Sequence, residues 1–312
     1  MDKISVVVPC YNKEDLVPIF YEEITKIVNK IKNRCEFEIV FVNDGSKDKT
    51  LEVIRKLNGK DKKVRYVSFT RNFGKEASIL AGLDASSGDY VAIMNVYLNE
   101  QVSLVEEMYD VLKEGVYDCV ATRVKSFKSE KKERFYHKRV KKILGDEECD
   151  LRLMSRQMVN SILELKEYNC FSKGIFNWLG YNIKWLEYKN VERVVKKNKL
   201  NFNRWFLNSL DKVMEFSIFP ILPTLIFVFF LFLIVIIVIL INMFFIENHV
   251  FNYFFLLSFL FIVGVVQIFY MGILGYYLSK IYLKLKRRPN YIIKETEVYS
   301  RNGSVLNERK NR

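Results

Sequence analysis

Two long stretches without a charged side chain constrain this chain most. Residues 216–246 contain no Asp, Glu, Lys or Arg, and neither do residues 250–279. A helix of about 20 apolar residues crosses the hydrocarbon core of a bilayer, so each stretch is long enough to span it with some tilt. Only Glu247, Asn248 and His249 lie between the two stretches. The sequence therefore predicts a transmembrane hairpin with a tight outer turn.

Basic residues on both sides of the hairpin predict its orientation. Arg204 and Lys212 precede the first span, and a cluster of Lys and Arg at residues 280–288 follows the second. Positively charged flanks stay on the cytoplasmic side, so both termini are expected in the cytoplasm. We expect no cleavable signal peptide, because residues at the start of the chain do not show a basic region followed by a short apolar run and a small-residue cleavage site. We therefore expect a multi-pass protein of the cell inner (plasma) membrane.

Outside the hairpin, the apolar pattern predicts an α/β fold for residues 1–200. Four apolar runs are typical of strands, and a segment with helical periodicity lies between each strand and the next. Such alternation predicts a Rossmann-like, mostly parallel sheet. The strands are expected at residues 4–8, 37–42, 64–69 and 91–94. Two further segments are assigned: an amphipathic juxtamembrane helix at 201–215 and a basic cytosolic tail at 280–312.

Charge and composition narrow the function. A net charge of +13 is compatible with nucleic acid or with an anionic membrane surface. Two predicted spans favour the membrane, and no zinc-finger or RNA-binding pattern is present, so no nucleic-acid partner is expected. Five scattered cysteines without C-x-x-C spacing indicate reduced thiols. Only His137 and His249 are histidines, which argues against a histidine-based metal site or a Ser-His-Asp triad.

Polar residues follow each predicted strand, where ligands bind in open α/β sheets. Asp44 can accept a hydrogen bond from a base or a ribose hydroxyl. Arg71 and Lys75, with backbone amides near Gly74 at a helix start, can hold a diphosphate. Each of these features taken singly is also common in purely structural turns. The fourth strand is followed by a polar turn that contains Asn95, Tyr97, Asn99 and Glu100.

Several ordered segments carry a resemblance to a known family. They read V-V-V-P-C-Y-N-K-E, V-N-D-G-S-K-D-K-T, R-N-F-G-K-E-A-S-I-L-A-G-L, C-D-L-R-L-M-S-R, F-N-W-L-G-Y, F-S-I-F-P and I-Y-L-K-L-K-R-R-P-N-Y-I. Together they resemble family 2 glycosyltransferases, in particular the bacterial polyprenyl-phosphate (bactoprenol) enzymes related to dolichol-phosphate mannose synthase. The resemblance runs from about residue 4 to residue 293 and includes the hairpin.

This resemblance implies a GT-A domain that moves a sugar, with inversion, from a nucleotide-sugar, usually UDP-linked, to polyprenyl phosphate at the inner leaflet. It also implies Mg²⁺ or Mn²⁺ as cofactor and a homo-oligomer packed through the membrane helices. The residues that it places at the nucleotide-sugar are Pro9, Tyr11, Glu14, Asp44, Arg71, Lys75 and Asn95.

The chain departs from the family pattern after the fourth strand. Where the family has D-A-D-L-Q-D-P, this chain has N-V-Y-L-N-E-Q at residues 95–101. Asn95 and Tyr97 thus stand at the usual metal-ligand positions, and neither supplies the carboxylate that a hard divalent ion prefers. Glu100 replaces the last aspartate, and Asp150 matches the aspartate of the family's D-F-R-L motif. These two carboxylates are the candidate catalytic residues.

A basic run at residues 123–142 is the candidate acceptor site. It contains ten Lys or Arg against two Glu. A solvated basic face is one interpretation, because charge runs commonly have that role. The other interpretation places Arg123, Lys125, Lys131 and Lys132 at the acceptor phosphate or at anionic headgroups.

Three hypotheses follow. The leading one is a membrane-anchored glycosyltransferase that acts on polyprenyl phosphate. Its rival is a catalytically inactive relative that binds a nucleotide or scaffolds a membrane glycosylation complex, and it is motivated by Asn95 and Tyr97. The third is transfer to another lipid or to a cell-wall glycan.

Overall fold

The computed structural model describes most of the chain in two compact units. The first unit comprises Met1–Lys196 and Arg288–Arg312, and the second comprises Lys197–Arg287. The residues described are 1–31, 33–97, 104–124, 151–165, 179–188, 229–230, 232–234, 236–237, 249–286 and 289–297.

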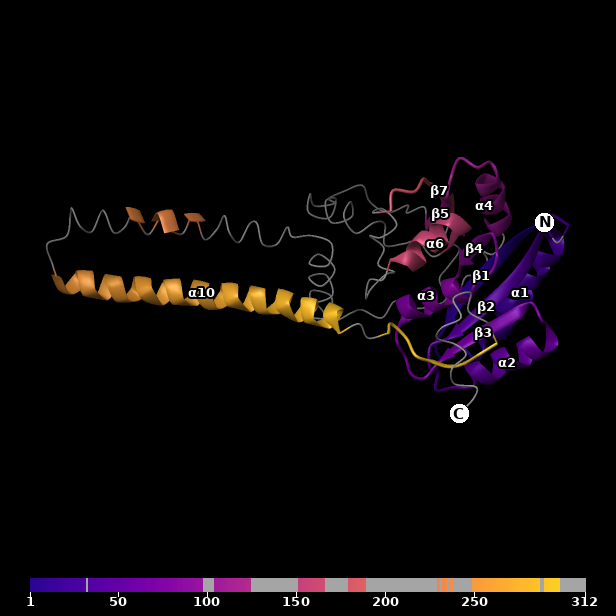
Figure 1. The fold of residues 1–312 in the computed structure, drawn as a ribbon, viewed down its shortest axis with the longest axis horizontal. Coiled ribbons are helices and arrows are strands. Elements are labelled where there is room, and N and C mark those ends of the chain that lie inside the picture. Colours follow the sequence, from indigo (N-terminus) through magenta and orange to yellow (C-terminus); the bar gives the residue numbers. More distant parts are fainter. Residues whose placement is uncertain are drawn as a thin grey trace. The chain divides into compact units, whose positions relative to one another are not determined.

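An eight-stranded sheet forms the centre of the first unit, in the order β7-β5-β6-β4-β1-β2-β3-β8 (Figure 1). β1 to β5 and β7 run in one direction, whereas β6 and β8 are antiparallel to their neighbours. The strands are β1 (Asp2–Cys10), β2 (Cys35–Asn43), β3 (Val64–Phe69), β4 (Tyr90–Ile93), β5 (Cys119–Val124), β6 (Arg152–Ser155), β7 (Ile183–Tyr188) and β8 (Ile293–Thr296). The predicted α/β class with a mostly parallel sheet is confirmed.

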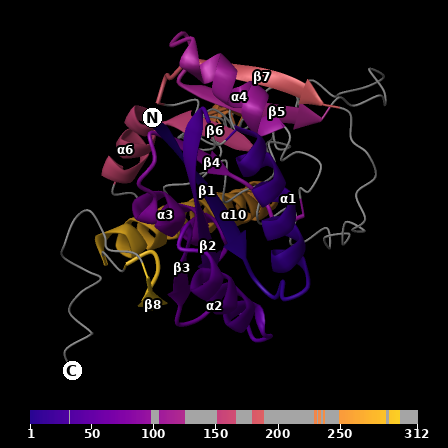
Figure 2. The same cartoon turned by 90° about the vertical axis from the view of Figure 1, so that its right-hand side faces the viewer.

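Helices cover both faces of this sheet (Figure 2). One apolar cluster packs α1, α2 and α4 on one face, and a second packs α3 and α6 on the other. Because both faces are covered, the central strands are apolar on successive residues: Val6 and Val8 belong to the first cluster and Val7 to the second. The helices are α1 (Leu16–Ile31), α2 (Thr50–Lys60), α3 (Lys75–Ala85), α4 (Leu104–Lys113) and α6 (Arg156–Glu164).

A buried carboxylate joins the first strands to the loop before β4. Glu38 is 3% exposed and accepts hydrogen bonds from Lys3 Nζ at 2.8 Å, Ser5 Oγ at 2.6 Å and the Ser87 amide at 2.6 Å. Arg65 Nη1 lies 3.2 Å from Oε2, the carboxylate oxygen that Lys3 also contacts. Burial by itself would raise the pKa of Glu38, but the hydrogen bonds from Lys3, Ser5 and Ser87 outweigh it and lower the pKa to about 2. The anion therefore fixes the α3–β4 connection to the sheet.

The last strand, β8, extends the sheet beyond β3. It pairs antiparallel to β3, and Tyr291 just before it stacks on Phe69 with ring centroids 5.1 Å apart. Sequence patterns assign this part of the chain to a basic tail and do not predict a strand there. Its residues Ile293, Lys294 and Glu295 carry too little apolar signal, as is common for short edge strands.

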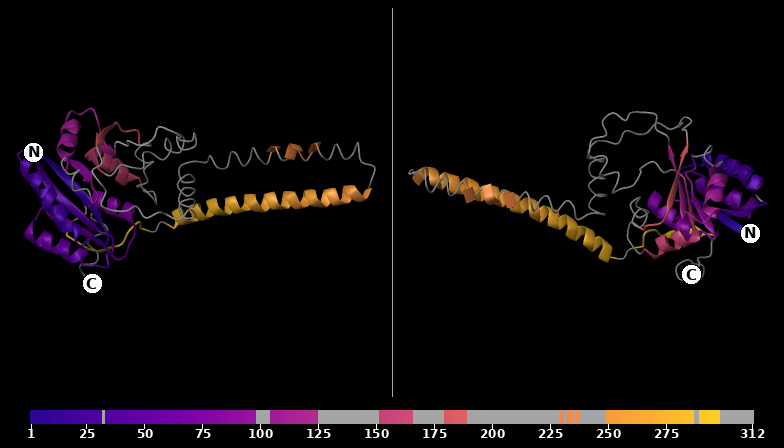
Figure 3. Two further views of the ribbon diagram at one scale, coloured as in Figure 1. Left: turned by 180° about the vertical axis from the view of Figure 1, so that it is seen from behind. Right: turned by 90° about the horizontal axis from the view of Figure 1, so that it is seen from above.

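The second unit contains α10 (His249–Leu285), a continuous helix (Figure 3). Within it, Phe259–Ser279 is long and apolar enough to cross a membrane, with a mean hydropathy of 2.0. The helix extends past both ends of the predicted second span at 250–279. Of the predicted first span at 216–246, residues 229–230, 232–234 and 236–237 are described and are helical. The rest of that span and the predicted helix at 201–215 lie outside the described residues, so the hairpin stays a prediction.

Candidate functional site

The carboxyl ends of β1 to β5 lie at one edge of the sheet, because these strands are parallel to one another. The loops that follow β1, β2, β3 and β4 therefore meet at this edge, which is where ligands bind in sheets of this kind. The edge brings together five predicted site residues from four different loops. They are Tyr11, Asp44, Arg71, Asn95 and Tyr97.

Side-chain to backbone hydrogen bonds join the loops after β1 and β2. The Asn12 amide donates to Ser46 Oγ at 3.0 Å, and the Lys47 amide donates back to Asn12 Oδ1 at 2.9 Å. Asn12 adopts a positive φ of 53°, which asparagine tolerates better than most residues. Glu14 Oε2 accepts from the Lys49 amide at 2.7 Å, just before α2. The carboxylate of Glu14 thus stabilises loop structure, and its predicted role at the nucleotide stays a prediction.

Asp44 fastens the loop after β2 to the loop after β3. Its side chain is buried, at 3% exposure. Oδ1 accepts from the Phe73 amide at 2.7 Å and Oδ2 from the Gly74 amide at 3.0 Å. Burial raises the pKa of Asp44, and the two amide hydrogen bonds offset part of that rise. The amides near Gly74, which the sequence suggests for a diphosphate, are thus bound by the protein's own carboxylate.

Gly45 allows the same two loops to approach closely. Its φ is +61°, and a Cβ at this position would lie 2.3 Å from the carbonyl carbon of Arg71. Only glycine accommodates both conditions without moving the backbone. The loop places the Arg71 guanidinium 4.9 Å from the centre of the Phe73 ring. Arg71 and Lys75, the first residue of α3, are both exposed at this edge.

Lys13 and Tyr97 connect the loop after β1 with the loop after β4. Lys13 Nζ lies 4.5 Å from the centroid of the Tyr97 ring. The Lys13 amide donates to Thr50 Oγ1 at 2.7 Å, which fixes the backbone from which this side chain extends. Tyr97 is 48% exposed and Asn95 is half-buried. Lys13 was not predicted as a site residue, because one lysine in a polar turn carries no signal until its neighbour across the sheet is known.

Two arginines extend the edge toward β5 and β6. Arg123 lies near the end of β5, and its Nη2 is 3.2 Å from Glu187 Oε1 in an ion pair whose partners are each 46% exposed. Arg152, at the start of β6, is buried and stands opposite Ile93 of β4 and Ala121 of β5. Sequence reasoning missed Arg152. Its position directly after Asp150 and Leu151, in the C-D-L-R-L-M-S-R segment that resembles the family, could have identified it as a site residue.

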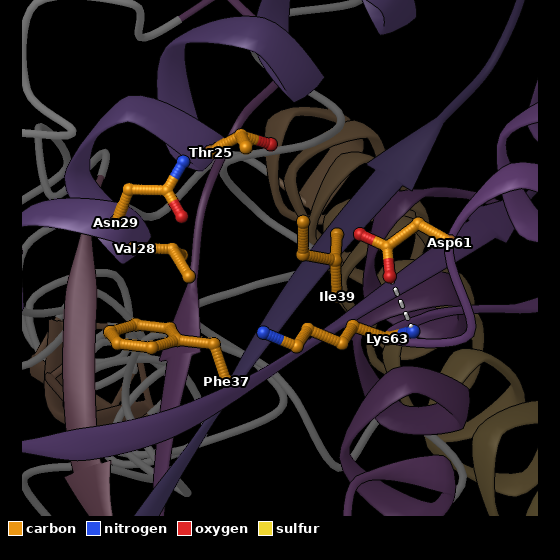
Figure 4. A pocket seen from close by; sticks show the side chains of 7 residues that line it. All are labelled: Thr25, Val28, Asn29, Phe37, Ile39, Asp61 and Lys63. Atoms are coloured by element: carbon orange, nitrogen blue, oxygen red, sulfur yellow. Dashed lines mark hydrogen bonds between the residues drawn. The ribbon is translucent and has the colours of Figure 1, made fainter. Parts of the chain in front are cut away.

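A small cavity lies at the other end of the sheet, beside α1 (Figure 4). Its volume is about 110 Å³, well below the roughly 300 to 1,000 Å³ typical of small-molecule pockets. The Lys63 amide donates to Asp61 Oδ1 at 2.9 Å at its rim. Asp61 and Lys63 lie just before β3, at its amino end. This cavity is therefore separate from the loops that follow β1 to β4. Its lining residues are Thr25, Val28, Asn29, Phe37, Ile39, Asp61 and Lys63.

Comparison with known proteins places this architecture in a family. A model of "Glycosyl transferase family 2" matches residues 5–184. The chain belongs to glycosyl transferase family 2. It is 36% identical to "Putative glycosyltransferase CsbB" of Bacillus subtilis (strain 168), across 98% of this chain and 96% of that protein. It is also 36% identical to "SfII prophage-derived bactoprenol glucosyl transferase" of Shigella flexneri, across 94% of this chain and 98% of that protein. The resemblance found in the motifs is confirmed.

Among solved structures, glucosyl-3-phosphoglycerate synthase from Mycobacterium tuberculosis is similar at a TM-score of 0.48 and 18% identity. The similarity covers 68% of this chain and 76% of that one. A likeness of this size carries no argument about the site.

The residues of this family 2 glycosyltransferase do not fit a divalent cation where the resemblance implies one. Asn95 offers an amide and Tyr97 a phenol, whereas Mg²⁺ and Mn²⁺ prefer carboxylate oxygens. The nearby carboxylate of Asp44 already accepts two backbone amides. Across the described part of the chain, no group of three or more Asp, Glu, His or Cys is arranged to hold a metal ion.

Five predicted site residues of the family 2 glycosyltransferase lie outside the described residues. They are Glu100, Lys125, Lys131, Lys132 and Asp150. Their roles stay predictions.

Proposed function

We propose that this family 2 glycosyltransferase moves a sugar from a UDP-linked nucleotide-sugar to polyprenyl phosphate at the inner leaflet of the membrane. The observation that carries the proposal is the 36% identity to bactoprenol glucosyl transferases over nearly the full length of both chains. A cluster of cationic and polar side chains at the strand ends, among them Lys13, Arg71 and Asn95, supports a nucleotide site at that edge.

The transfer is a displacement at the anomeric carbon. An oxygen of the polyprenyl phosphate attacks C1 and forms a new C1–O bond with inverted configuration. The bond between C1 and the diphosphate oxygen breaks, and the electron pair leaves with UDP. A phosphate monoester has a second pKa of about 6, so it is mostly ionised at neutral pH and needs no general base.

Roles follow from position at the edge of the sheet. Tyr11 and Pro9, at the end of β1, are assigned to the base and ribose, with Glu14 and Asp44 shaping the loops around them. Arg71, Lys75 and Asn95 are assigned to the diphosphate and sugar. Glu100 and Asp150 are proposed as catalytic carboxylates, and the acceptor phosphate is assigned to Arg123, Lys125, Lys131 and Lys132.

Membrane anchoring is part of the proposal. α10 contains a segment, Phe259–Ser279, that is long and apolar enough to span a bilayer. Together with the uncharged run at residues 216–246, it supports a two-span protein with both termini in the cytoplasm. In this arrangement the lipid phosphate reaches the catalytic domain from the inner leaflet. We also propose that the protein is a homo-oligomer.

A transfer assay tests the function. Full-length protein in detergent is incubated with undecaprenyl phosphate and a set of radiolabelled UDP-sugars, and label in the lipid fraction is counted. We expect label from at least one sugar, reduced about tenfold or more in Arg71→Met, because one charge-assisted contact to the diphosphate is lost. Lys56→Met, on the exposed side of α2, is the control with the same change in net charge. Absence of labelled lipid with every sugar, with and without Mn²⁺, would refute the proposal.

A second candidate is a catalytically silent relative that binds the nucleotide or scaffolds a glycosylation complex. Asn95 and Tyr97, which lack carboxylates, favour it. The Asn95→Asp/Tyr97→Asp double variant, assayed beside the wild type with and without Mn²⁺, separates the two candidates. Turnover by the double variant alone supports the silent relative, whereas turnover by the wild type rules it out.

A further inference from the structure

We infer that the ammonium of Lys13, held over the ring of Tyr97, faces the diphosphate of a bound nucleoside diphosphate, so that this site binds the nucleotide without a divalent cation. The inference rests on the proposed function, because it concerns the same nucleotide site. It goes further by naming the group that takes the place of the metal.

The position of Lys13 is set by two adjacent strands. β1 and β4 are parallel neighbours, with Val7 opposite Ile93, so the loops that follow them emerge side by side (Figure 1). Lys13 comes from the first loop and Tyr97 from the second, and the ammonium lies 4.5 Å from the ring centroid. The charge therefore lies beside Tyr97, the residue that stands where the resemblance puts a metal-binding carboxylate.

The residue at position 97 determines whether the positive charge of Lys13 is neutralised by an ion pair. An aromatic ring attracts an ammonium through its quadrupole but does not neutralise it. A carboxylate at position 97 would form an ion pair with Lys13 and cancel the charge. With Tyr97, the ammonium is held over the ring and is not paired with a carboxylate at position 97.

Three described acidic side chains of the neighbouring loops, those of Asp44, Glu14 and Asp48, are engaged with the backbone. Asp44 accepts from the Phe73 and Gly74 amides, and Glu14 accepts from the Lys49 amide. Asp48 accepts from the Glu14 amide at 3.2 Å and from the Thr50 amide at 3.1 Å. These carboxylates stabilise the loops and do not form a ligand set for a metal. A divalent cation beside the Lys13 ammonium would also be repelled by it.

The charges of this arrangement suit an anionic leaving group. When the bond between C1 and the diphosphate oxygen breaks, the electron pair stays on that oxygen and negative charge grows there. The Lys13 ammonium stabilises this charge electrostatically, without transfer of a proton. Arg71, exposed after β3, adds a second positive charge at the same edge.

Nucleotide binding without turnover tests the inference. Uridine 5′-diphosphate is titrated into full-length protein in detergent by calorimetry, once in EDTA and once in Mn²⁺. We compare the wild type with Lys13→Met, Tyr97→Asp and the charge-matched control Lys56→Met, after thermal melts show that each variant is folded. We expect wild-type affinity to differ less than about twofold between EDTA and Mn²⁺. In EDTA, Lys13→Met and Tyr97→Asp are each expected to bind about tenfold more weakly, whereas Lys56→Met is unchanged.

The outcomes separate this inference from the proposed function. If the wild type binds uridine 5′-diphosphate only with Mn²⁺, or if Lys13→Met binds like Lys56→Met, the inference is wrong while the proposed function stands. If no variant binds the nucleotide under either condition, both fail. If Lys13→Met alone were unfolded, the Tyr97→Asp result in EDTA would still decide, because that change keeps the lysine and neutralises it.

Discussion

Replacing Glu38 by glutamine should destabilise the domain at neutral pH and have little effect in acid. In the folded protein Glu38 accepts hydrogen bonds from Lys3, Ser5 and Ser87, and its pKa is about 2 instead of the usual 4.5. A fall of this size corresponds to roughly 3 kcal/mol of preference for the charged form. Lys3 and Arg65 are 32% and 24% exposed, so water screens part of their attraction, and we expect a loss of about 2 kcal/mol.

The dependence on pH gives this prediction its specificity. A carboxyl whose pKa is lower in the folded state stabilises the fold above its unfolded pKa, and this contribution disappears as the pH falls toward the folded pKa. The free energy of unfolding of the wild type should therefore exceed that of Glu38→Gln by the full difference of about 2 kcal/mol at pH 6 to 7. This difference in the free energy of unfolding should shrink as the pH falls from 4.5 toward 2.

Thermal melts of the full-length protein in detergent, followed by tryptophan fluorescence, measure the effect. A loss of about 2 kcal/mol in a domain of this size lowers Tm by roughly 4 to 8 °C. Glu36→Gln is the matched control, since Glu36 lies on the same strand and is exposed. Equal Tm values for the two variants at pH 7, or a difference that persists unchanged at pH 3, would show that the buried anion does not hold the α3–β4 connection.

Further predictions concern the loops and the C-terminal segment. Gly45→Ala should lower Tm by several degrees, because its Cβ meets the Arg71 backbone and its φ is positive, whereas Gly59→Ala in α2 should be neutral or stabilising by about 0.5 to 1 kcal/mol. Asp84→Asn should raise Tm at pH 7 and leave it unchanged at pH 3. Burial raises the pKa of Asp84 more than the hydrogen bond from Tyr291 lowers it, so the charged form is unfavourable in the folded protein. Glu295→Gln, which removes the partly exposed ion pair with Arg55, should change stability by less than about 1 kcal/mol in a melt at pH 7. Equal melting curves for Gly45→Ala and Gly59→Ala, a pH-independent effect of Asp84→Asn, or a large loss in Glu295→Gln would contradict these expectations.

The sequence was sufficient for the central strands. β1 to β4 carry apolar, β-branched runs that end in turn residues, and buried strands of a parallel sheet leave that pattern. β8 could not be predicted, because Ile293–Thr296 is short, half charged and lies after a predicted membrane span. Its place depends on contacts with β3 and on the stacking of Tyr291, which a local pattern does not contain.

For the site, the sequence predicted the location better than the roles. Asp44 and Arg71 were expected at the strand ends and lie there. The two amides that Asp44 binds, from Phe73 and Gly74, lie about thirty residues further along the chain, so its part in joining the loops required the fold. Lys13 was missed for the same reason, since its contact with Tyr97 exists only once β1 and β4 are neighbours.

The position of β8 has a consequence for how the protein is made. β3 is complete at Phe69, but its partner on the outer side, β8, ends at Thr296, close to the end of the chain. Roughly 230 residues are synthesised between the two, which takes about 10 to 50 s at ~5–20 residues per second. During that interval β3 presents unpaired backbone groups to other chains. Completion of the sheet therefore follows synthesis of α10, and the nascent protein is most prone to edge-to-edge association before β8 has emerged.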